Sequence, residues 1–95
     1  MSDLSHFRAR IDRIDDQIVD LLAQRFAIGR EVAEFKLRHD IPVVLPERIT
    51  QVKQRCAERG AHQGLDSSFL LALYDRIIER TCDIERQIHA AQHKT

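Results

Sequence analysis

One long amphipathic stretch constrains the fold of this 95-residue chain more than any other feature. From Leu4 to His39 there is no proline, and apolar residues recur in alternating steps of four and three, the spacing of a single helical face. The apolar positions are Phe7, Ile11, Ile14, Ile18, Leu21, Ile28, Val32 and Phe35. The pattern predicts one uninterrupted helix over residues 4–39, capped at its start by Asp3 or Ser5.

The length of this predicted helix has a consequence for assembly. About 36 residues with a rise of about 1.5 Å each span roughly 54 Å. A compact domain of this chain length has a diameter of only about 32 Å. The helix therefore projects beyond any globule that its own chain can build, and we expect a second copy of the chain to cover its apolar stripe.

A short helix is predicted after the long one. Pro42 disfavours the helical conformation just before it, so residues 41–45 are expected to form an extended linker. Pro46 is well placed as the first residue of a second helix, which is predicted over residues 46–59. Gly60 and Gly64 are expected to end this helix and form the loop that follows.

The last segment predicts a helix of medium length over residues 67–92, capped by Asp66, with a tail that frays from His93. No stretch shows the alternation of a strand. The predicted fold is therefore all-α, a single domain over residues 1–95. Three helices of these lengths do not close a bundle alone, so we expect two chains to form an intertwined homodimer.

The composition narrows the class of partner and the location. Lys+Arg and Asp+Glu both number 15, and this balance argues against nucleic acid or a membrane surface as the main partner. No apolar run approaches the roughly 18 residues that a bilayer span needs. The first residues lack the basic and apolar regions of a secretory signal peptide, so the cytoplasm is the expected location.

The sequence shows no pattern of a metal site or of a covalent nucleophile. Cys56 and Cys82 have no partner at metal-ligand spacing and are expected to be free thiols. The five histidines also lack such partners, and no glycine-rich phosphate loop is present. An enzyme with this sequence is therefore expected to use no metal, no cofactor and no nucleophilic residue.

Charged residues interrupt the apolar faces of the predicted helices. Arg25 continues the spacing of the long apolar stripe, and Lys36 lies about 20° from it around the helix axis. Thr81 and Glu85 lie one turn apart on the apolar line of the third helix, and Arg48 lies in the first turn of the second. Cations placed inward need a buried anion or carboxylate as partner.

Arg8 lies about 25 Å before Arg25 on the same predicted helix, so the two cannot share a site within one chain. In an antiparallel pair of long helices, Arg8 reaches the partner's site instead. Two equivalent sites per dimer would result, each built from both chains.

Each residue also has a structural interpretation. Arg25 can pair with Glu31 or Asp20 and extend to solvent, while Lys36 can interact with the helix dipole. Arg8 and Arg48 can be surface residues. Glu85 can bridge to Arg86, and the Thr81 hydroxyl can bond back to its own helix.

Taken together, the sequence resembles the small all-α chorismate mutases, the AroQ class, from about residue 7 to residue 87. The resemblance rests on RxxIDxID at 8–15, LLAQR at 21–25, GREVAEFK at 29–36, PER at 46–48, GLD at 64–66 and the IIE…T…E stretch at 77–85. It implies that the chain rearranges chorismate, a small dicarboxylate, to prephenate.

The resemblance also implies a role for each candidate residue. Arg8 of the partner and Arg25 would bind the two substrate carboxylates, and Lys36 would contact the ether oxygen and a carboxylate. Arg48 would support the site, Thr81 would touch a carboxylate, and Glu85 would lie beside the ether oxygen.

Two departures bear on the substrate. Common bacterial members carry two carboxylates early in the second helix, which contact the ring hydroxyl of the substrate; Leu45 and Ile49 stand there in this chain. The position beside the ether oxygen is often glutamine and is Glu85 here. Relatives that rearrange 4-amino-4-deoxychorismate or split isochorismate share the scaffold, so both remain alternatives. A non-catalytic dimerisation module, in which Arg25, Lys36 and Glu85 form a buried ion network, is the alternative outside enzymes.

Overall fold

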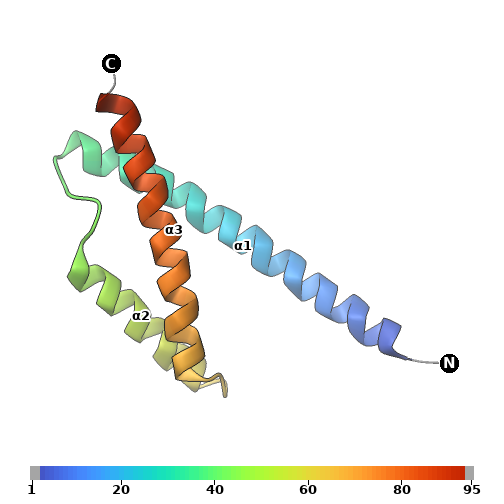
Figure 1. Cartoon of the computed structure of the whole chain (residues 1–95). Helices are drawn as coiled ribbons and strands as arrows, with labels where there is room; N and C mark the ends of the chain where they lie inside the picture. The colour runs from blue at the N-terminus through green and yellow to red at the C-terminus, as the bar shows by residue number, and fades with distance from the viewer. Residues whose placement is uncertain (1–2, 94–95) are drawn as a thin grey trace.

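The protein consists of three α-helices, seen in a computed structural model that describes residues 3–93 (Figure 1). They are α1 (Leu4–Arg38), α2 (Pro46–Ala61) and α3 (Ser67–His93). The described residues form no strand. The prediction of a long, a short and a medium helix is confirmed, and residues 94–95 of the tail expected to fray lie outside the described range.

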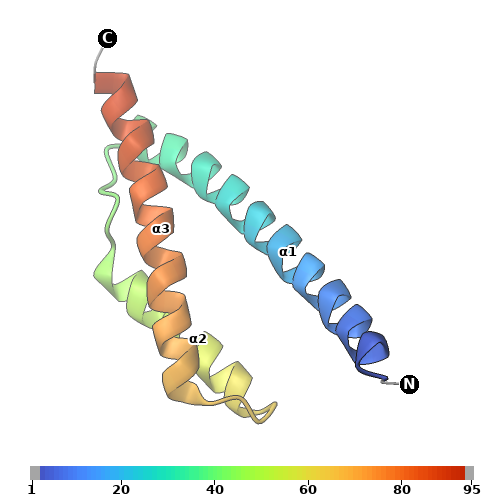
Figure 2. The same cartoon turned by 45° about the vertical axis from the view of Figure 1, so that its right-hand side comes forward.

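Helix α3 is the central element, because both other helices pack on it. Figures 1 and 2 show α2 beside the N-terminal half of α3, while the C-terminal half of α1 crosses the C-terminal half of α3. The contacts agree with this arrangement: Lys53 of α2 pairs with Asp75, and His89 of α3 contacts the Ala33 carbonyl oxygen of α1 at 2.9 Å.

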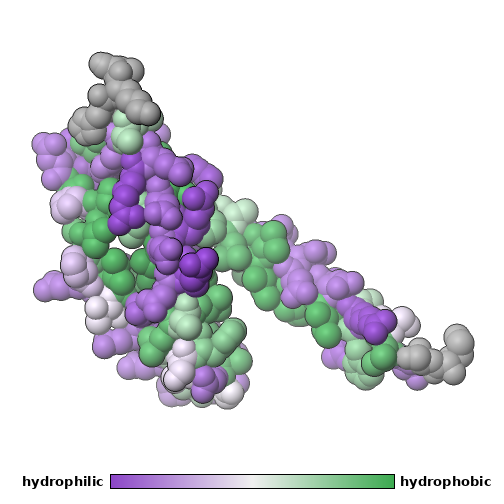
Figure 3. Space-filling view, viewed as in Figure 1, coloured by the Kyte–Doolittle hydropathy of each residue, from purple (hydrophilic) through white to green (hydrophobic). Residues whose placement is uncertain are grey.

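The N-terminal half of α1 projects away from the other two helices as an arm (Figure 1). The chain measures 62 × 28 × 15 Å and has a radius of gyration of 17.2 Å. A compact chain of this length would have a radius of gyration of about 12 Å. Seven apolar residues of the arm are each more than half exposed: Leu4, Phe7, Ile11, Ile14, Ile18, Val19 and Leu21. Apolar surface is visible along the arm in Figure 3.

The core within one chain is small, because α1 buries only two small residues, Gly29 and Ala33, against α3. The other buried residues come from α2 and α3. The buried apolar residues are Ala33, Val52, Ala57, Leu70, Cys82 and Ile84. Glu85 is the buried charged residue among those described, with 4% of its surface exposed. A carboxyl group this deep in a small core requires a partner.

The ends of the helices agree with the sequence in part. Asp66 caps α3 as predicted, because its Oδ2 accepts a hydrogen bond of 2.8 Å from the Phe69 backbone N–H. Asp3 occupies the N-cap of α1, but its side chain makes no capping hydrogen bond, so the predicted cap is wrong in that respect. Ser5 lies inside the helix.

Gly60 does not end α2, which continues to Ala61. Gly60 is buried, and a Cβ atom added there would clash with Leu70 Cδ1 on α3. The residue is therefore a point of close helix contact and not a helix stop. The turn follows at Gly64, whose φ of +80° is the left-handed conformation that glycine adopts freely.

The linker between α1 and α2 turns sharply and then continues over residues 41–45 without regular structure, with a bend at Val43; the extended conformation predicted for it is seen at Leu45, whose φ is −118° and ψ 93°. Asp40 has a φ of 55°, and the Ile41 N–H donates to the Lys36 carbonyl oxygen at 2.8 Å. This turn directs the linker back along the side of α1 that carries Lys36. Within the described residues, no helix is long and apolar enough to cross a membrane.

Candidate active site

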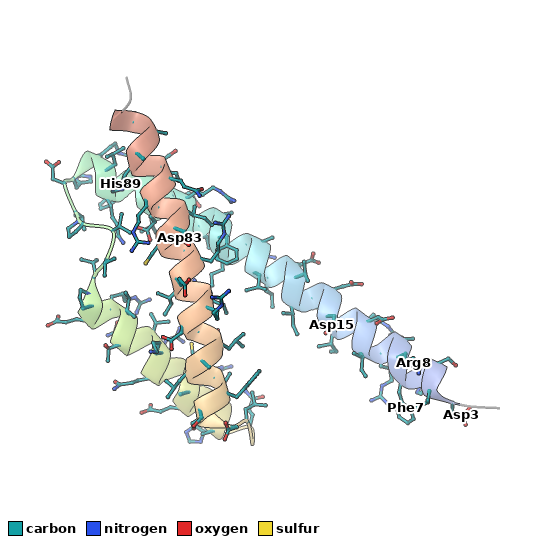
Figure 4. All side chains as sticks on the ribbon, viewed as in Figure 1. Asp3, Phe7, Arg8, Asp15, Asp83 and His89 are labelled. Carbon is teal, nitrogen blue, oxygen red and sulfur yellow. The ribbon has the colours of Figure 1, made fainter. Side chains whose placement is uncertain are left out.

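A cavity of about 290 Å³ lies between α1, the linker, α2 and α3. Its lining residues are Arg25, Ile28, Gly29, Val32, Lys36, Val43, Leu45, Arg48, Ile49, Val52, Ile78, Thr81, Cys82 and Glu85. Seven of the eight candidate residues from the sequence are among them, the exception being Arg8. Arg8 lies near the far end of the arm, well away from α2 and α3 (Figure 4).

Lys36 points inward and contacts the buried carboxyl group of α3. Its Nζ lies 2.8 Å from Glu85 Oε1, and their side chains are only 12% and 5% exposed. The same Nζ donates a hydrogen bond of 2.8 Å to the Val43 carbonyl oxygen in the linker. Glu85 Oε1 accepts no hydrogen bond of good geometry from the described residues, so the contact with Lys36 is an ion pair. Glu85 does not bridge to Arg86, which pairs with Asp83.

Arg25 is held by α3 through neutral groups. Its Nη1 donates a hydrogen bond of 3.1 Å to Thr81 Oγ1, and its Cζ lies 6.0 Å from the centre of the Tyr74 ring. The interpretation in which Arg25 pairs with Glu31 or Asp20 is wrong, since the described residues give it no ion pair with either. The charge of Arg25 is therefore left uncompensated next to the cavity.

Thr81 connects Arg25 to the backbone of α3. Its hydroxyl donates a hydrogen bond of 2.9 Å to the Ile77 carbonyl oxygen while it accepts the bond from Arg25. A hydroxyl has a single proton to donate, so in this state Thr81 has none left for a substrate carboxylate. The structural interpretation of Thr81, a hydroxyl bonded back to its own helix, is confirmed.

Gly29 permits this contact between α1 and α3. A Cβ atom at position 29 would lie 3.3 Å from Thr81 Cγ2, closer than most side-chain contacts. Gly29 is buried and lines the cavity, so the absence of a side chain keeps the floor of the cavity open. The sequence offered no sign of this beyond one glycine inside a predicted helix.

The cavity has a polar side and an apolar side. Arg48 lies exposed at the rim and donates a hydrogen bond of 2.7 Å to Gln51 Oε1. Leu45, Ile49 and Val52 form the apolar wall contributed by the linker and α2. Ile28 and Val32 face it from α1 and are 58% and 40% exposed in the single chain.

Two titratable groups near the cavity are shifted. Burial raises the pKa of the Cys82 thiol, and the neighbouring Glu85 carboxyl raises it further. Burial also raises the pKa of Tyr74, and a hydrogen bond with Cys56 adds to the shift. Both groups therefore stay neutral at ordinary pH, and the charged groups that line the cavity are Arg25, Lys36, Arg48 and Glu85.

This arrangement suits a small organic anion with an apolar body. Two cationic side chains with N–H donors line a confined space together with hydrocarbon side chains from all three helices. Cys56 and Cys82 are free, as predicted, and the described residues contain no cluster of side chains that could hold a metal ion.

Fold and cavity together define an all-helical protein with a cavity lined in part by cationic side chains. The sequence profile described as Chorismate mutase type II matches residues 7–86. The chain belongs to this family, whose activity is an isomerase reaction.

Individual relatives agree with the family. The chain is 36% identical to a 4-amino-4-deoxychorismate mutase of Streptomyces venezuelae over 99% of its own length and 91% of the relative's. It is 39% identical to one of Streptomyces pristinaespiralis over 86% of this chain and 64% of the relative. A chorismate mutase of Methanocaldococcus jannaschii is 29% identical over 88% of this chain and 85% of the relative.

Proposed function

We propose that this chain is a mutase that rearranges chorismate to prephenate at two sites of a homodimer. The observation that carries the proposal is the cavity. Arg25 and Lys36 line it together with apolar side chains from all three helices. The family match adds that the reaction is an isomerisation. The product has the same atoms as the substrate, so the site needs no co-reactant.

The chemistry asks the site for two things. The first is to hold a flexible dianion in the compact conformer that reacts, and bidentate pairs between arginines and carboxylates suit this task. Arg25 is the intrachain arginine for it. The second is to stabilise negative charge on the ether oxygen while the C–O bond breaks. Lys36 is fixed by the Val43 carbonyl oxygen and can meet that charge.

Glu85 changes what Lys36 can do. An ionised Glu85 compensates the charge of Lys36 and repels a developing oxyanion, whereas a protonated Glu85 donates a hydrogen bond to it. We therefore assign Glu85 and Lys36 as the pair beside the ether oxygen. Arg48 at the rim supports the bound substrate, and Thr81 holds Arg25.

The second substrate carboxylate needs another cation, which we assign to the partner's Arg8. The apolar arm supports this dimer, because its exposed stripe is too long to leave in water. The stripe is also nearly symmetric about Leu21. Positions paired across Leu21 are Phe7 with Phe35, Ile11 with Val32, and Ile14 with Ile28.

A stripe of this symmetry fits a second α1 that runs antiparallel, with Leu21 of both chains near the two-fold axis. In that register the partner's Arg8 lies opposite residue 34. Residue 34 is two positions before Lys36, so the partner's Arg8 and Lys36 are offset along the helix axis by only about 3 Å. An antiparallel pairing with this symmetry would therefore bring the arm of each chain next to the cavity of the other chain.

An amino group is the second candidate for the ring substituent of the substrate, after the hydroxyl group of chorismate. Leu45 and Ile49 give the cavity an apolar wall where common family members have carboxylates that contact the ring hydroxyl. The two Streptomyces relatives named above are 4-amino-4-deoxychorismate mutases. 4-Amino-4-deoxychorismate is therefore the second candidate substrate, and isochorismate cleavage to salicylate and pyruvate is the third reaction to test.

We also propose that the enzyme is located in the cytoplasm.

The test is product analysis after incubation with chorismate, isochorismate and 4-amino-4-deoxychorismate in parallel. We expect prephenate from chorismate, or the amino analogue of prephenate from the amino substrate. Lack of turnover of all three substrates would contradict the mutase. A dimerisation module then becomes the better account, and a bicyclic diacid that mimics the transition state should not raise the Tm.

A further inference from the structure

Tyr74 lies next to Arg25, one of the residues that line the cavity. It is half-buried on α3, and its ring lies beside the Arg25 guanidinium, with Cζ 6.0 Å from the ring centre. Tyr74 does not line the cavity itself. Its phenol lies close enough to the Cys56 thiol of α2 for that thiol to contribute to its raised pKa. One side chain of α3 thus lies near both the cation on α1 and a thiol on α2.

The two groups that hold Arg25 lie on one face of α3. Tyr74 and Thr81 are seven residues apart, which is about two helical turns. Thr81 accepts a hydrogen bond from one nitrogen of the guanidinium, and the Tyr74 ring lies beside its carbon. Together these two contacts restrict the position and the orientation of the Arg25 guanidinium, which ends a long and otherwise flexible side chain.

The neutral character of both groups matters for binding. A carboxylate beside Arg25 would hold it firmly, but it would also occupy the donors and the charge that a substrate carboxylate needs. An aromatic ring attracts a guanidinium through the negative potential of its face. This attraction uses no N–H donor, so the donors of the guanidinium that Thr81 does not engage stay available.

The environment of Tyr74 keeps it suited to this task. Burial, the hydrogen bond with Cys56 and the charge of Cys56 raise the pKa of the phenol, while the nearby Arg25 and Arg55 lower it to a smaller extent. The phenol therefore remains protonated at neutral pH. It does not become a competing anion beside Arg25.

We propose that Tyr74 is a positioning residue that holds the Arg25 guanidinium ready for a substrate carboxylate. The inference rests on the proposed function, because it takes Arg25 as a carboxylate-binding residue. The ring, and not the hydroxyl, is the part of Tyr74 that acts on the guanidinium.

The test compares Tyr74→Leu, Tyr74→Met and Tyr74→Phe in steady-state kinetics with chorismate and with 4-amino-4-deoxychorismate. Removing the ring should raise KM about tenfold with a smaller change in kcat, the size expected of one partly desolvated cation–ring contact. Tyr74→Phe keeps the ring and should stay within about threefold of the wild type. Leu71→Ala, on the same helix and outside the cavity, controls for general loosening of α3.

A double mutant separates this inference from the proposed function. If Tyr74 acts through Arg25, Tyr74→Leu should cause no further loss in an Arg25→Ala background. A wild-type KM in Tyr74→Leu or Tyr74→Met, while Arg25→Ala raises KM strongly, would overturn the role of Tyr74 alone. Equal losses in Tyr74→Phe and Tyr74→Leu would also overturn it. A wild-type KM in Arg25→Ala would overturn the proposed role of Arg25 as well.

Discussion

Lys36 Nζ lies 2.8 Å from Glu85 Oε1, inside the cavity that also contains the uncompensated Arg25. The lysine that we propose to stabilise charge on the ether oxygen is thus paired with a carboxylate of its own chain. Because an ionised Glu85 cancels part of the field of Lys36, replacing its carboxylate by a neutral hydrogen-bond donor should raise the rate.

The first prediction concerns Glu85→Gln. Glutamine keeps the size of the side chain and donates a hydrogen bond at every pH. In the wild type the carboxylate is ion-paired with Lys36 and repels a developing oxyanion, so the kcat of Glu85→Gln should exceed that of the wild type. Steady-state kinetics of both proteins at neutral pH check this, and a kcat in the variant at or below the wild-type value would contradict it.

The second prediction concerns the hydroxyl that holds Arg25. Thr81→Val keeps the shape of the side chain but removes the acceptor that lies 3.1 Å from Arg25 Nη1. Loss of one hydrogen bond to a charged group should lower kcat/KM about tenfold or more. Thr81→Ser restores the hydroxyl and should recover most of it. If the valine variant matches the serine variant, Thr81 contributes only packing.

The third prediction follows from the raised pKa of Cys82. Burial, with Glu85 nearby, disfavours the thiolate, so iodoacetamide should modify Cys82 only at a pH above the range of an ordinary thiol. The unfolded chain loses the proton more easily, so the stability that the neutral thiol contributes is lost as pH rises toward and through the raised pKa. Mass spectrometry of labelled protein checks this, and a bicyclic diacid in the cavity should slow the labelling further. Rapid labelling of Cys82 at neutral pH would contradict the buried position.

The fourth prediction tests the register of the arms. In a chain with Cys56→Ser and Cys82→Ala, the added Leu21→Cys should form a disulfide between two copies, because residue 21 lies near the two-fold axis. Ala23→Cys, two residues along and on the other side of α1, is the matched control and should not cross-link. Non-reducing electrophoresis reads the result. Equal cross-linking of both variants would contradict the antiparallel register at Leu21.

The sequence predicted the elements of the fold well because their signals are local. The apolar stripe of α1, Pro46 at the start of α2 and the Asp66 cap each act within a few residues. Gly60 was misread as a helix stop, since its real role depends on Leu70 of another helix.

The site was predictable in its residues but not in its contacts. Five of the seven candidates that line the cavity are visible in the sequence as polar or charged residues on or near apolar helix faces, whereas Leu45 and Ile49 came only from the family resemblance. Which of them meet is a matter of helix packing. The dimerisation-module alternative placed Lys36 and Glu85 in one ion network, as observed, but it included Arg25, which bonds to Thr81 instead. The Val43 carbonyl oxygen is a backbone group and leaves no signal in the sequence at all.

The central claim is that each site is shared between two chains, and subunit mixing tests it most directly. Arg8→Ala and Lys36→Ala should each be inactive as homodimers. Mixed after exchange of subunits, they should recover about a quarter of the wild-type activity, because half the dimers then contain one intact site of two. A mixture of Arg25→Ala with Lys36→Ala should stay inactive, since both residues belong to the same chain's half of the site. If the first mixture also stays inactive after verified exchange, the shared site is contradicted.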